Sequence, residues 1–283
     1  MHNHSFMATY SHAIQRLRAG ATEQITDQLA LEEPLEIRLL FGPSDRRMQQ
    51  RIAVTMRTPG QDAALALGFL WTEGLLRNAA HFQSAAHQTR CRPEAAGNIL
   101  EVALTPAAPV DLKKLHRNFY MSSSCGVCGK ASMEAIHVAP AQQLPTPAPF
   151  LSRALLYSLP ERLRARQSVF DRTGGLHAAA LFTPEGTLLH LHEDVGRHNA
   201  VDKVIGAALQ SGQLPLHGAV LLVSGRASFE LVQKALLAGI PCLAAVGAPS
   251  SLAVQLAQAH GLTLVGFLRD HRANVYTHPE RIS

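Results

Sequence analysis

Residues 219–246 have the sequence AVLLVSGRASFELVQKALLAGIPCLAAV, and this stretch decides the fold class of the chain. Two apolar runs of strand length, 219–223 and 242–246, flank a segment of helical length and spacing over 228–238. A strand that returns through a helix to a neighbouring strand forms a parallel pair. The stretch therefore predicts a βαβ unit and an α/β core.

The alternation of helices and strands continues on both sides of this unit. Residues 235–268 contain no Asp, Glu, Lys or Arg, but prolines and glycines divide them into short pieces. We therefore expect buried strands and helices there rather than a membrane span. The order predicts a mixed, largely parallel sheet between helices. The expected elements are helices over 152–166, 198–210, 228–238 and 250–259, and strands over 176–182, 187–192, 219–223, 242–246 and 262–268.

The first half of the chain has a different pattern. Two apolar stretches within 33–56, separated by Gly42-Pro43-Ser44-Asp45, predict a hairpin, and we expect a helix over 61–76 and a strand over 98–104. Residues 139–149, APAQQLPTPAP, hold four prolines and no charge, as a linker does. The predicted organisation is a loose leader (1–30), an α+β domain (31–138), the linker (139–149) and a second domain (150–283).

The composition limits the classes of function. With 47% hydrophobic and 17% charged residues, the 283-residue chain is neither disordered nor fibrous. Four cysteines exclude a disulfide scaffold, and the N-terminus lacks a secretory signal, so we expect a reducing, cytoplasmic setting. Arg supplies 21 of the 26 cations behind the net charge of +5, which suits recognition of phosphate or carboxylate, although genome composition explains it equally well. No basic block points to nucleic acid.

The stretch SSSCGVCGK (122–130) carries the most specific chemistry. Cys125 and Cys128 fit in one turn, and a helix that begins near Lys130 would stabilise a thiolate. A thiolate is the nucleophile for disulfide exchange and for accepting sulfur as a persulfide. Half of a zinc site and a pair of structural cysteines are the alternatives, but Cys91 and Cys242 belong to no second CxxC motif. A reactive thiol is favoured.

Four further stretches place charged or polar groups beside predicted strands, where open α/β sheets bind ligands. The stretch VSGRAS (223–228) offers helix amides and Arg226 to an anion, and GFLRDHR (266–272) offers Phe267 for stacking and two arginines for phosphates. The ordinary alternatives are a core histidine, a solvated helix start and a solvated C-terminal tail. The other two stretches are TGGLHAA (173–179), with His177, and HEDVGRHNAVDK (192–203).

In combination, these stretches resemble the FdhD family, whose members are sulfurtransferases needed for active formate dehydrogenase. The stretches APSSLAVQLA (248–257) and YTHPERI (276–282) resemble it too, and the resemblance extends from about residue 33 onward. It implies that Cys125 accepts sulfur from a cysteine desulfurase as a persulfide, with Cys128 as the second loop cysteine. The sulfur then passes to the molybdenum (or tungsten) bis-guanine-dinucleotide cofactor before its insertion into formate dehydrogenase.

The resemblance also implies a binding segment, a fold and an assembly. The cofactor, or a mimic such as GDP, is expected to bind at Phe267, Leu268, Arg269, Asp270, His271 and Arg272. The expected fold is α/β, with a C-terminal cytidine deaminase-like α/β/α sandwich and a smaller N-terminal α+β domain. A homodimer is expected, without nucleic acid, membrane or a metal of its own.

Three other classes of function use the same residues. A zinc deaminase needs a Glu two residues after its His, but His177 is followed by Ala178 and Ala179. A dithiol oxidoreductase would cycle Cys125 and Cys128 through a disulfide. A non-catalytic molybdenum cofactor-binding delivery chaperone would share every feature except the need for Cys125.

Overall fold

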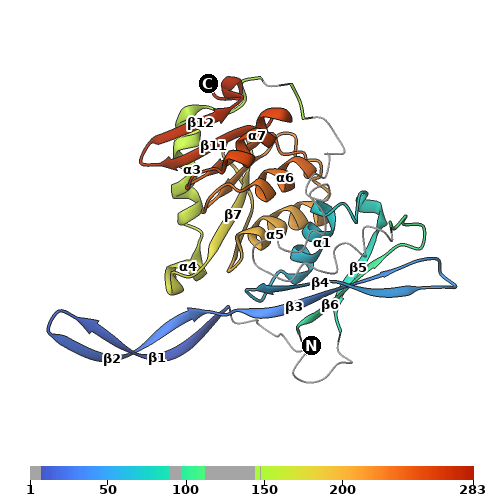
Figure 1. Ribbon diagram of the computed structural model, residues 1–283, viewed down its shortest axis with the longest axis horizontal. Helices are drawn as coiled ribbons and strands as arrows, with labels where there is room; N and C mark the ends of the chain where they lie inside the picture. Colours follow the sequence, from blue (N-terminus) through green and yellow to red (C-terminus); the bar gives the residue numbers. More distant parts are fainter. Residues whose placement is uncertain (1–7, 89–96, 112–143, 147) are drawn as a thin grey trace.

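The computed structural model describes residues 8–88, 97–111, 144–146 and 148–283. Within these residues the strands form three sheets, of two, four and six strands. Figure 1 shows the two-stranded hairpin extending to the lower left, the four-stranded sheet at the lower right and the six-stranded sheet with its helices above them. The mixed α/β character predicted from the sequence is confirmed.

The six-stranded sheet has the order β12-β11-β10-β9-β7-β8. The βαβ unit is confirmed, because β9, β10 and β11 are parallel neighbours. The other three pairings are antiparallel, so the expectation of a largely parallel sheet is wrong for the outer strands. Short turns cause two of these, β7–β8 and β11–β12, since strands joined by a tight turn must run in opposite directions. The strands are β7 (His177–Phe182), β8 (Leu188–Asp194), β9 (Val220–Val223), β10 (Cys242–Ala245), β11 (Thr263–Arg269) and β12 (Arg272–Thr277).

Helices cover both faces of this sheet. Side chains alternate between the faces along each strand, so Leu221 and Leu243 pack with α5, α6 and α7, while Leu222 and Ala244 pack with α3. Ser152 caps α3 as its position predicts, because its side chain accepts a hydrogen bond from Leu155 N. The helices are α3 (Arg153–Arg164), α4 (Ser168–Thr173), α5 (Arg197–Gln210), α6 (Phe229–Leu237) and α7 (Ser251–Ala259).

The four-stranded sheet has the order β4-β3-β6-β5, and α1 (Asp62–Thr72) packs on it. The predicted hairpin is β3 (Glu33–Phe41) with β4 (Met48–Arg57), and the predicted strand is β6 (Ile99–Leu104). Strand β5 (Phe82–His87), at the sheet edge, was not predicted, because none of its side chains is buried. The helix candidate near Lys130 and most of the predicted linker lie outside the described residues.

The leader predicted over residues 1–30 is instead a β-hairpin from residue 9 onward. Strands β1 (Thr9–Arg18) and β2 (Ala21–Ala30) pair antiparallel through a two-residue turn with Gly20 at φ 81°. Cross-strand partners match in character, as in Ile14 opposite Ile25 and Arg16 opposite Glu23. The hairpin has no clear sequence pattern because most of its side chains are exposed and none is buried, so the two faces differ little in polarity.

Helices α1 and α5 cross in backbone contact and join the cores of the two larger sheets. A Cβ atom added at Gly206 would lie 1.8 Å from the carbonyl oxygen of Ala64, and one added at Gly68 would lie 1.9 Å from that of Asp202. No side chain fits at either position. Leu209 of α5 belongs to the core of the four-stranded sheet, and Trp71 of α1 packs against the core of the six-stranded sheet.

Two buried ion pairs flank this crossing. Lys203 Nζ lies 2.7 Å from Asp194 Oδ2 and donates to Thr58 O at 2.9 Å, while Thr58 N donates to Asp194 at 3.2 Å. Lys234 Nζ lies 2.8 Å from both Asp202 Oδ1 and Thr72 Oγ1. In each pair a threonine of the N-terminal part completes the hydrogen bonding, so both charges are satisfied only when the two parts are docked.

We expect Gly206→Ala to destabilise the protein. Alanine normally favours a helix by about 1 kcal/mol over glycine, but here the methyl group must separate α1 from α5, at about 3 kcal/mol or more. Urea unfolding measures the loss. The control is Gly218→Ala, where an added Cβ has no atom within 4 Å, and its free energy of unfolding should stay within about 0.5 kcal/mol of the wild type. Equal losses of unfolding free energy in the two variants would contradict the close backbone contact between α1 and α5.

We expect Lys203→Met to lower the free energy of unfolding by about 3–5 kcal/mol, because it leaves the buried Asp194 carboxylate without its cation. The control is Asp171→Asn, which breaks the ion pair between Arg164 and Asp171, both more than half exposed, and should cost less than about 1 kcal/mol. Chemical denaturation of both variants makes the comparison. A small, similar loss in both would show that Lys203 does not hold the two parts together.

Candidate functional site

Four strands of the large sheet end at one edge. Strands β9, β10 and β11 are parallel to one another. Strand β7 is antiparallel to both β8 and β9, so β8 runs in the same direction as these three strands. Strand β7 starts at this edge with His177, which pairs with Asp194. The structure therefore brings together the stretches that the sequence singled out at 173–179, 192–203, 223–228 and 266–272. This is the edge at which open α/β sheets bind ligands.

Hydrogen bonds from backbone N–H groups tie three of these stretches to one another. Ala178 N donates to Ser224 Oγ at 2.9 Å, Gly247 N donates to Gly225 O at 3.0 Å, and Phe267 N donates to Gly247 O at 3.0 Å. The glycines permit this closeness, because a Cβ at Gly247 would lie 3.0 Å from Gly225 O. The edge is thus a connected, pre-formed surface rather than a set of separate loops.

The dense charge of HEDVGRHNAVDK has a largely structural explanation, which corrects the functional interpretation of that stretch. Asp194, Asp202 and Lys203 belong to the two buried ion pairs. The Glu193 carboxylate caps α4, accepting hydrogen bonds from Val169 N at 3.0 Å and Phe170 N at 2.8 Å. His198 Nε2 lies 3.7 Å from the Glu230 carboxylate, so this stretch leaves mainly His192 and Arg197 available to a ligand.

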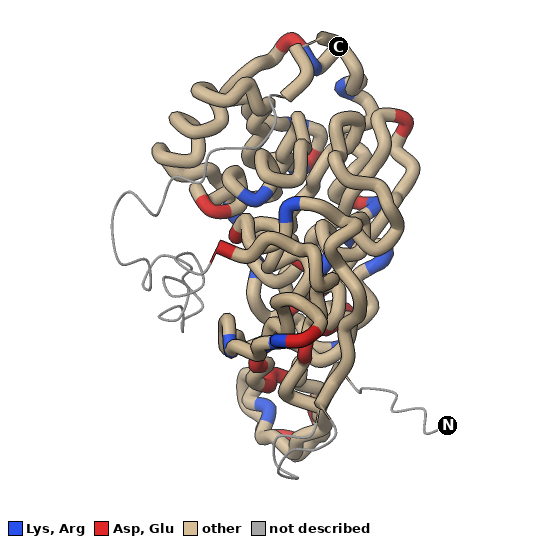
Figure 2. Tube along the Cα trace, turned by 90° about the vertical axis from the view of Figure 1, so that its right-hand side faces the viewer, with Lys and Arg blue, Asp and Glu red and all other residues tan. Residues whose placement is uncertain are grey.

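Positive groups surround His177 at this edge. Burial lowers the pKa of His177, and the positive charges of Arg197, His198 and Arg226 lower it further against the opposing effect of Asp194. Within the described part of the chain, Arg197 and Arg226 form no ion pair, and the buried Arg197 Nε has no hydrogen-bond partner. Figure 2 shows basic and acidic residues interspersed along the trace, so these cations are a local feature. A neutral imidazole among unpaired cations suits an anionic ligand.

The segment predicted to bind the cofactor is the turn of a β-hairpin. Asp270 and His271 form the turn, with φ of 51° and 54°, between Arg269 of β11 and Arg272 of β12. Arg269 and Arg272 are exposed and lie opposite each other on the two strands of the hairpin. Neither has an ion-pair partner among the described residues. Two guanidiniums side by side on a tight turn are well placed for phosphate.

The other two residues of that segment are held more tightly. Leu268 is fully buried against the α3 face of the sheet, so its side chain is part of the core. Phe267 is partly buried, and its φ of 53° marks the irregularity between Gly266 and Arg269 that rotates the following residues. The turn lies against α3, since the His271 ring meets the Tyr157 ring edge-on at 6.2 Å between centroids.

A cleft of about 600 Å³ opens beside this edge. Residues of α3 and α4 line one side of it, and Ser224 and Val246, directly after β9 and β10, line the other. Figure 1 shows α3 and α4 beside β7. The cleft contains His177 and the glycines of the TGGLHAA stretch. Its lining residues are Pro160, Leu163, Arg164, Gln167, Phe170, Gly174, Gly175, Leu176, His177, Ser224 and Val246.

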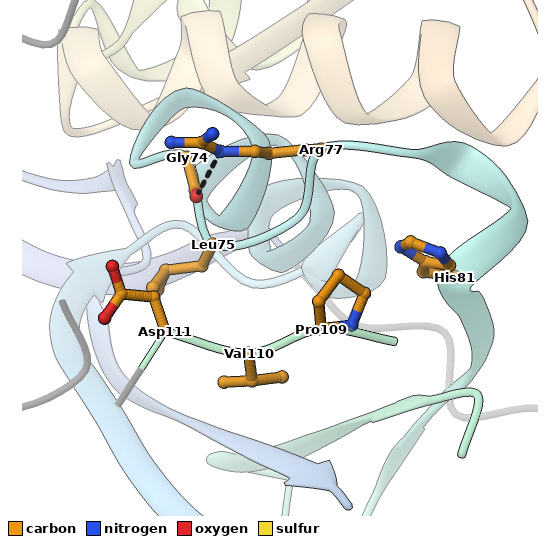
Figure 3. Close-up of a pocket in the computed structure, with 7 residues that line it drawn as sticks. All are labelled: Gly74, Leu75, Arg77, His81, Pro109, Val110 and Asp111. Atoms are coloured by element: carbon orange, nitrogen blue, oxygen red, sulfur yellow. Dashed lines mark hydrogen bonds between the residues drawn. The ribbon is translucent and has the colours of Figure 1, made fainter. Parts of the chain in front are cut away.

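A second hollow, of about 330 Å³, lies on the N-terminal part of the molecule. Figure 3 shows Leu75, Pro109 and Val110 in it, with the Arg77 guanidinium turned back to donate to Gly74 O at 3.4 Å. None of the stretches singled out from the sequence contributes to this hollow. The edge of the six-stranded sheet is therefore the better candidate site.

The predicted catalytic residues Cys125 and Cys128 lie outside the described residues, as does Cys91. The remaining cysteine, Cys242, is fully buried in β10, and burial raises the pKa of its thiol to about 12 against a small opposing effect of Arg281. A thiol with that pKa is not a nucleophile at neutral pH. In the described ranges we find no group of three side chains suited to a metal ion and no helix long and apolar enough to cross a membrane.

Relatives of this chain share most of its length. Sulfur carrier protein FdhD of Streptomyces avermitilis is 55% identical over 271 residues, covering 95% of this chain and 93% of its own. The protein of the same name from Saccharolobus solfataricus is 40% identical, covering 94% of this chain and 95% of its own. Among solved structures, a protein described as a formate dehydrogenase accessory protein from Desulfotalea psychrophila superposes with a TM-score of 0.75.

That crystal structure is 25% identical to this chain and covers 98% of it, and the match spans 100% of the other chain. The likeness therefore includes the four-stranded and the six-stranded sheets with their helices. The sequence pattern of the FdhD/NarQ family matches residues 31–283, which hold the candidate site and the two cysteines of the CxxC motif. The chain belongs to the FdhD/NarQ family.

Proposed function

We propose that this protein carries sulfur as a persulfide on Cys125 and delivers it to the molybdenum (or tungsten) bis-guanine-dinucleotide cofactor that formate dehydrogenase requires. The observation that carries the proposal is the CxxC stretch at 122–130 in a chain 55% identical to a sulfur carrier protein. Cys242 is buried and its thiol is poorly acidic, so it does not compete for this role. The reaction needs reduced thiols, which fits the cytoplasm.

In the first step, the Cys125 thiolate attacks the outer sulfur of a persulfide on a cysteine desulfurase. One S–S bond forms as another breaks, and the desulfurase cysteine leaves as a thiolate that takes up the proton lost by Cys125. No net oxidation or reduction occurs. The product is a persulfide on Cys125.

In the second step, the outer sulfur leaves as sulfide toward the cofactor. The Cys128 thiolate attacks the Cys125 sulfur, so a Cys125–Cys128 disulfide forms as the bond to the outer sulfur breaks, and the two electrons pass to that sulfur. A cellular thiol reductant then reopens the disulfide. This step gives Cys128 the role of resolving thiol.

The edge of the six-stranded sheet supports the choice of acceptor. A cofactor with two guanine nucleotides carries several phosphates, and the unpaired Arg269 and Arg272 at the β11–β12 turn match that charge. Arg197 and Arg226 add positive potential nearby. The name of the Desulfotalea psychrophila relative points to formate dehydrogenase as the enzyme served. The homodimer expected from the family stays a prediction.

We expect Cys125→Ala to abolish sulfur loading. Incubation of the wild-type protein with a cysteine desulfurase and cysteine should add about 32 Da per sulfur, reversed by reductant, because a persulfide is a reducible cap on a thiol. Intact-protein mass spectrometry measures the adduct. The matched control is Cys242→Ala, which should load like the wild type, and Cys128→Ala should load but release its sulfur slowly.

An adduct that persists in Cys125→Ala would rule out Cys125 as the carrier. If no adduct forms on the wild type while guanine nucleotide still binds, the protein is a non-catalytic molybdenum cofactor-binding delivery chaperone.

We expect Arg269→Ala to weaken GDP binding about tenfold or more, since it removes a charge-assisted hydrogen bond to phosphate. Isothermal titration calorimetry measures the affinity. Arg16→Ala on the β1–β2 hairpin is the control, because it removes the same charge from an exposed side chain outside the β11–β12 turn. Equal affinity of the Arg269→Ala variant and the wild type would remove this turn from the phosphate site.

A further inference from the structure

His177 carries an imidazole ring that the fold does not use. The side chain is half-buried at the start of β7 and lines the cleft of about 600 Å³. Neither ring nitrogen forms a hydrogen bond or an ion pair within the described residues, and neither is sealed from solvent. A histidine that belongs to a core has its nitrogens bonded, as buried polar groups generally do. His177 therefore has the contacts of a reactive group rather than those of a core residue.

The sheet fixes the position of this ring. The backbone of His177 pairs with Asp194 of β8, and the next residue, Ala178, donates to Ser224 Oγ at 2.9 Å. Gly225 lies against the ring, because a Cβ atom added there would be 3.3 Å from Nδ1 and 3.5 Å from Cε1. A small reactant in the cleft would thus meet an imidazole in a defined place.

The charges around His177 keep its ring neutral and attract an anion. Burial lowers the pKa of His177, the cations Arg197, His198 and Arg226 lower it further, and Asp194 opposes them. A neutral imidazole is the form that accepts a proton. The charged groups that face the ring or line its cleft are Arg197 and His198 of α5, Asp194 of β8, Arg226 after β9, and Arg164 of α3 with its partner Asp171 of α4.

His177 lies along the sheet edge from the β11–β12 turn, where Arg269 and Arg272 suit phosphate. Strands β10 and β9 separate β11 from β7, so three inter-strand spacings lie between the two places. At about 4.8 Å per spacing this is about 14 Å. An elongated cofactor with its phosphates at the turn can therefore extend its reacting end toward His177.

We propose that His177 is the proton acceptor for sulfur delivery, taking the proton of hydrosulfide as the sulfur binds the metal of the cofactor. The inference rests on the proposed function, because it assigns a role to this side chain in the second step of that reaction. It adds a residue that acts on the sulfur after Cys125 has released it.

The proton has to move because the outer sulfur leaves Cys125 as hydrosulfide, HS⁻, which still carries one. As the bond from sulfur to the metal forms, the S–H bond breaks, its electron pair stays on sulfur, and an N–H bond forms on the imidazole. The ligand that the sulfur displaces leaves the metal with its own electron pair and takes the proton from the imidazolium. Nothing is oxidised or reduced, and His177 returns to its neutral form.

The test follows radioactive sulfur from the protein to the molybdenum bis-guanine-dinucleotide cofactor. The protein is loaded by a cysteine desulfurase with labelled cysteine and mixed with the cofactor below saturation, and the label in the cofactor is counted after chromatography. We expect His177→Ala to load like the wild type and to transfer about 100-fold more slowly, the usual contribution of a positioned acid or base.

Two readouts separate proton transfer from a structural role. The ratio of the wild-type rate to the His177→Ala rate should rise with pH and then level off, because only the neutral ring accepts a proton and thiol ionisation affects both proteins alike. Its midpoint should equal the pKa of His177 measured by NMR in the free protein, below the ordinary 6.5, and Arg197→Gln should raise both. Added imidazole should speed transfer by His177→Ala and leave the wild type unchanged.

The matched control is His190→Ala on β8. The His190 Nε2 atom lies 2.6 Å from Gln213 Oε1, and the side chain does not line the cleft. This variant should transfer sulfur at the wild-type rate and should not respond to imidazole. The thermal unfolding temperature of His177→Ala should stay close to that of the wild type, because the ring that it removes makes no hydrogen bond within the described residues.

Transfer by His177→Ala at the wild-type rate would overturn the inference, and so would slow transfer that imidazole does not restore. Failure of the proposed function gives different results. A wild-type protein that loads sulfur but passes none to the cofactor would overturn the proposed acceptor together with this inference, and one that does not load would remove Cys125 as the carrier.

Discussion

The structure depends on the backbone contact between α1 and α5. Gly68 and Gly206 let the two helices approach until neither position has room for a Cβ atom, and the ion pairs Asp194–Lys203 and Asp202–Lys234 then close on either side. The pairs are buried, so they are satisfied only with the threonines of the N-terminal part in place. Because α5 begins directly after β8, the same contact that docks the two parts also fixes one border of the candidate site.

This arrangement explains why the charged stretch at 192–203 misleads when it is judged from sequence. A catalytic carboxylate and a carboxylate in a buried ion pair are the same residue type in the sequence. Only their partners in the folded structure distinguish them. Here Thr58 bonds to Lys203 across 145 positions of sequence, and Thr72 bonds to Lys234 across 162. No local pattern contains such pairs. Half-buried side chains such as His177 and Arg197 belong to neither buried ion pair, so they remain the candidates for binding a ligand.

The local spacing of apolar residues was sufficient to predict those elements that bury one face or all of their surface. The βαβ unit, the β3–β4 hairpin and the capped start of α3 all follow from apolar spacing and turn residues. The β1–β2 hairpin was not predicted, because neither of its faces is buried.

The proposed function places two demands on different kinds of structure. Recognising a large anionic heterocycle needs fixed geometry, and the sheet edge supplies it through hydrogen bonds that connect Ser224, Gly247 and Phe267. Carrying sulfur needs an accessible thiolate, and the rigid core cannot supply one, since burial holds the pKa of Cys242 at about 12. A protein that both binds a cofactor and delivers sulfur to it therefore has to keep its reactive cysteine out of the sheet, and the CxxC stretch at 122–130 falls between the two sheets in sequence.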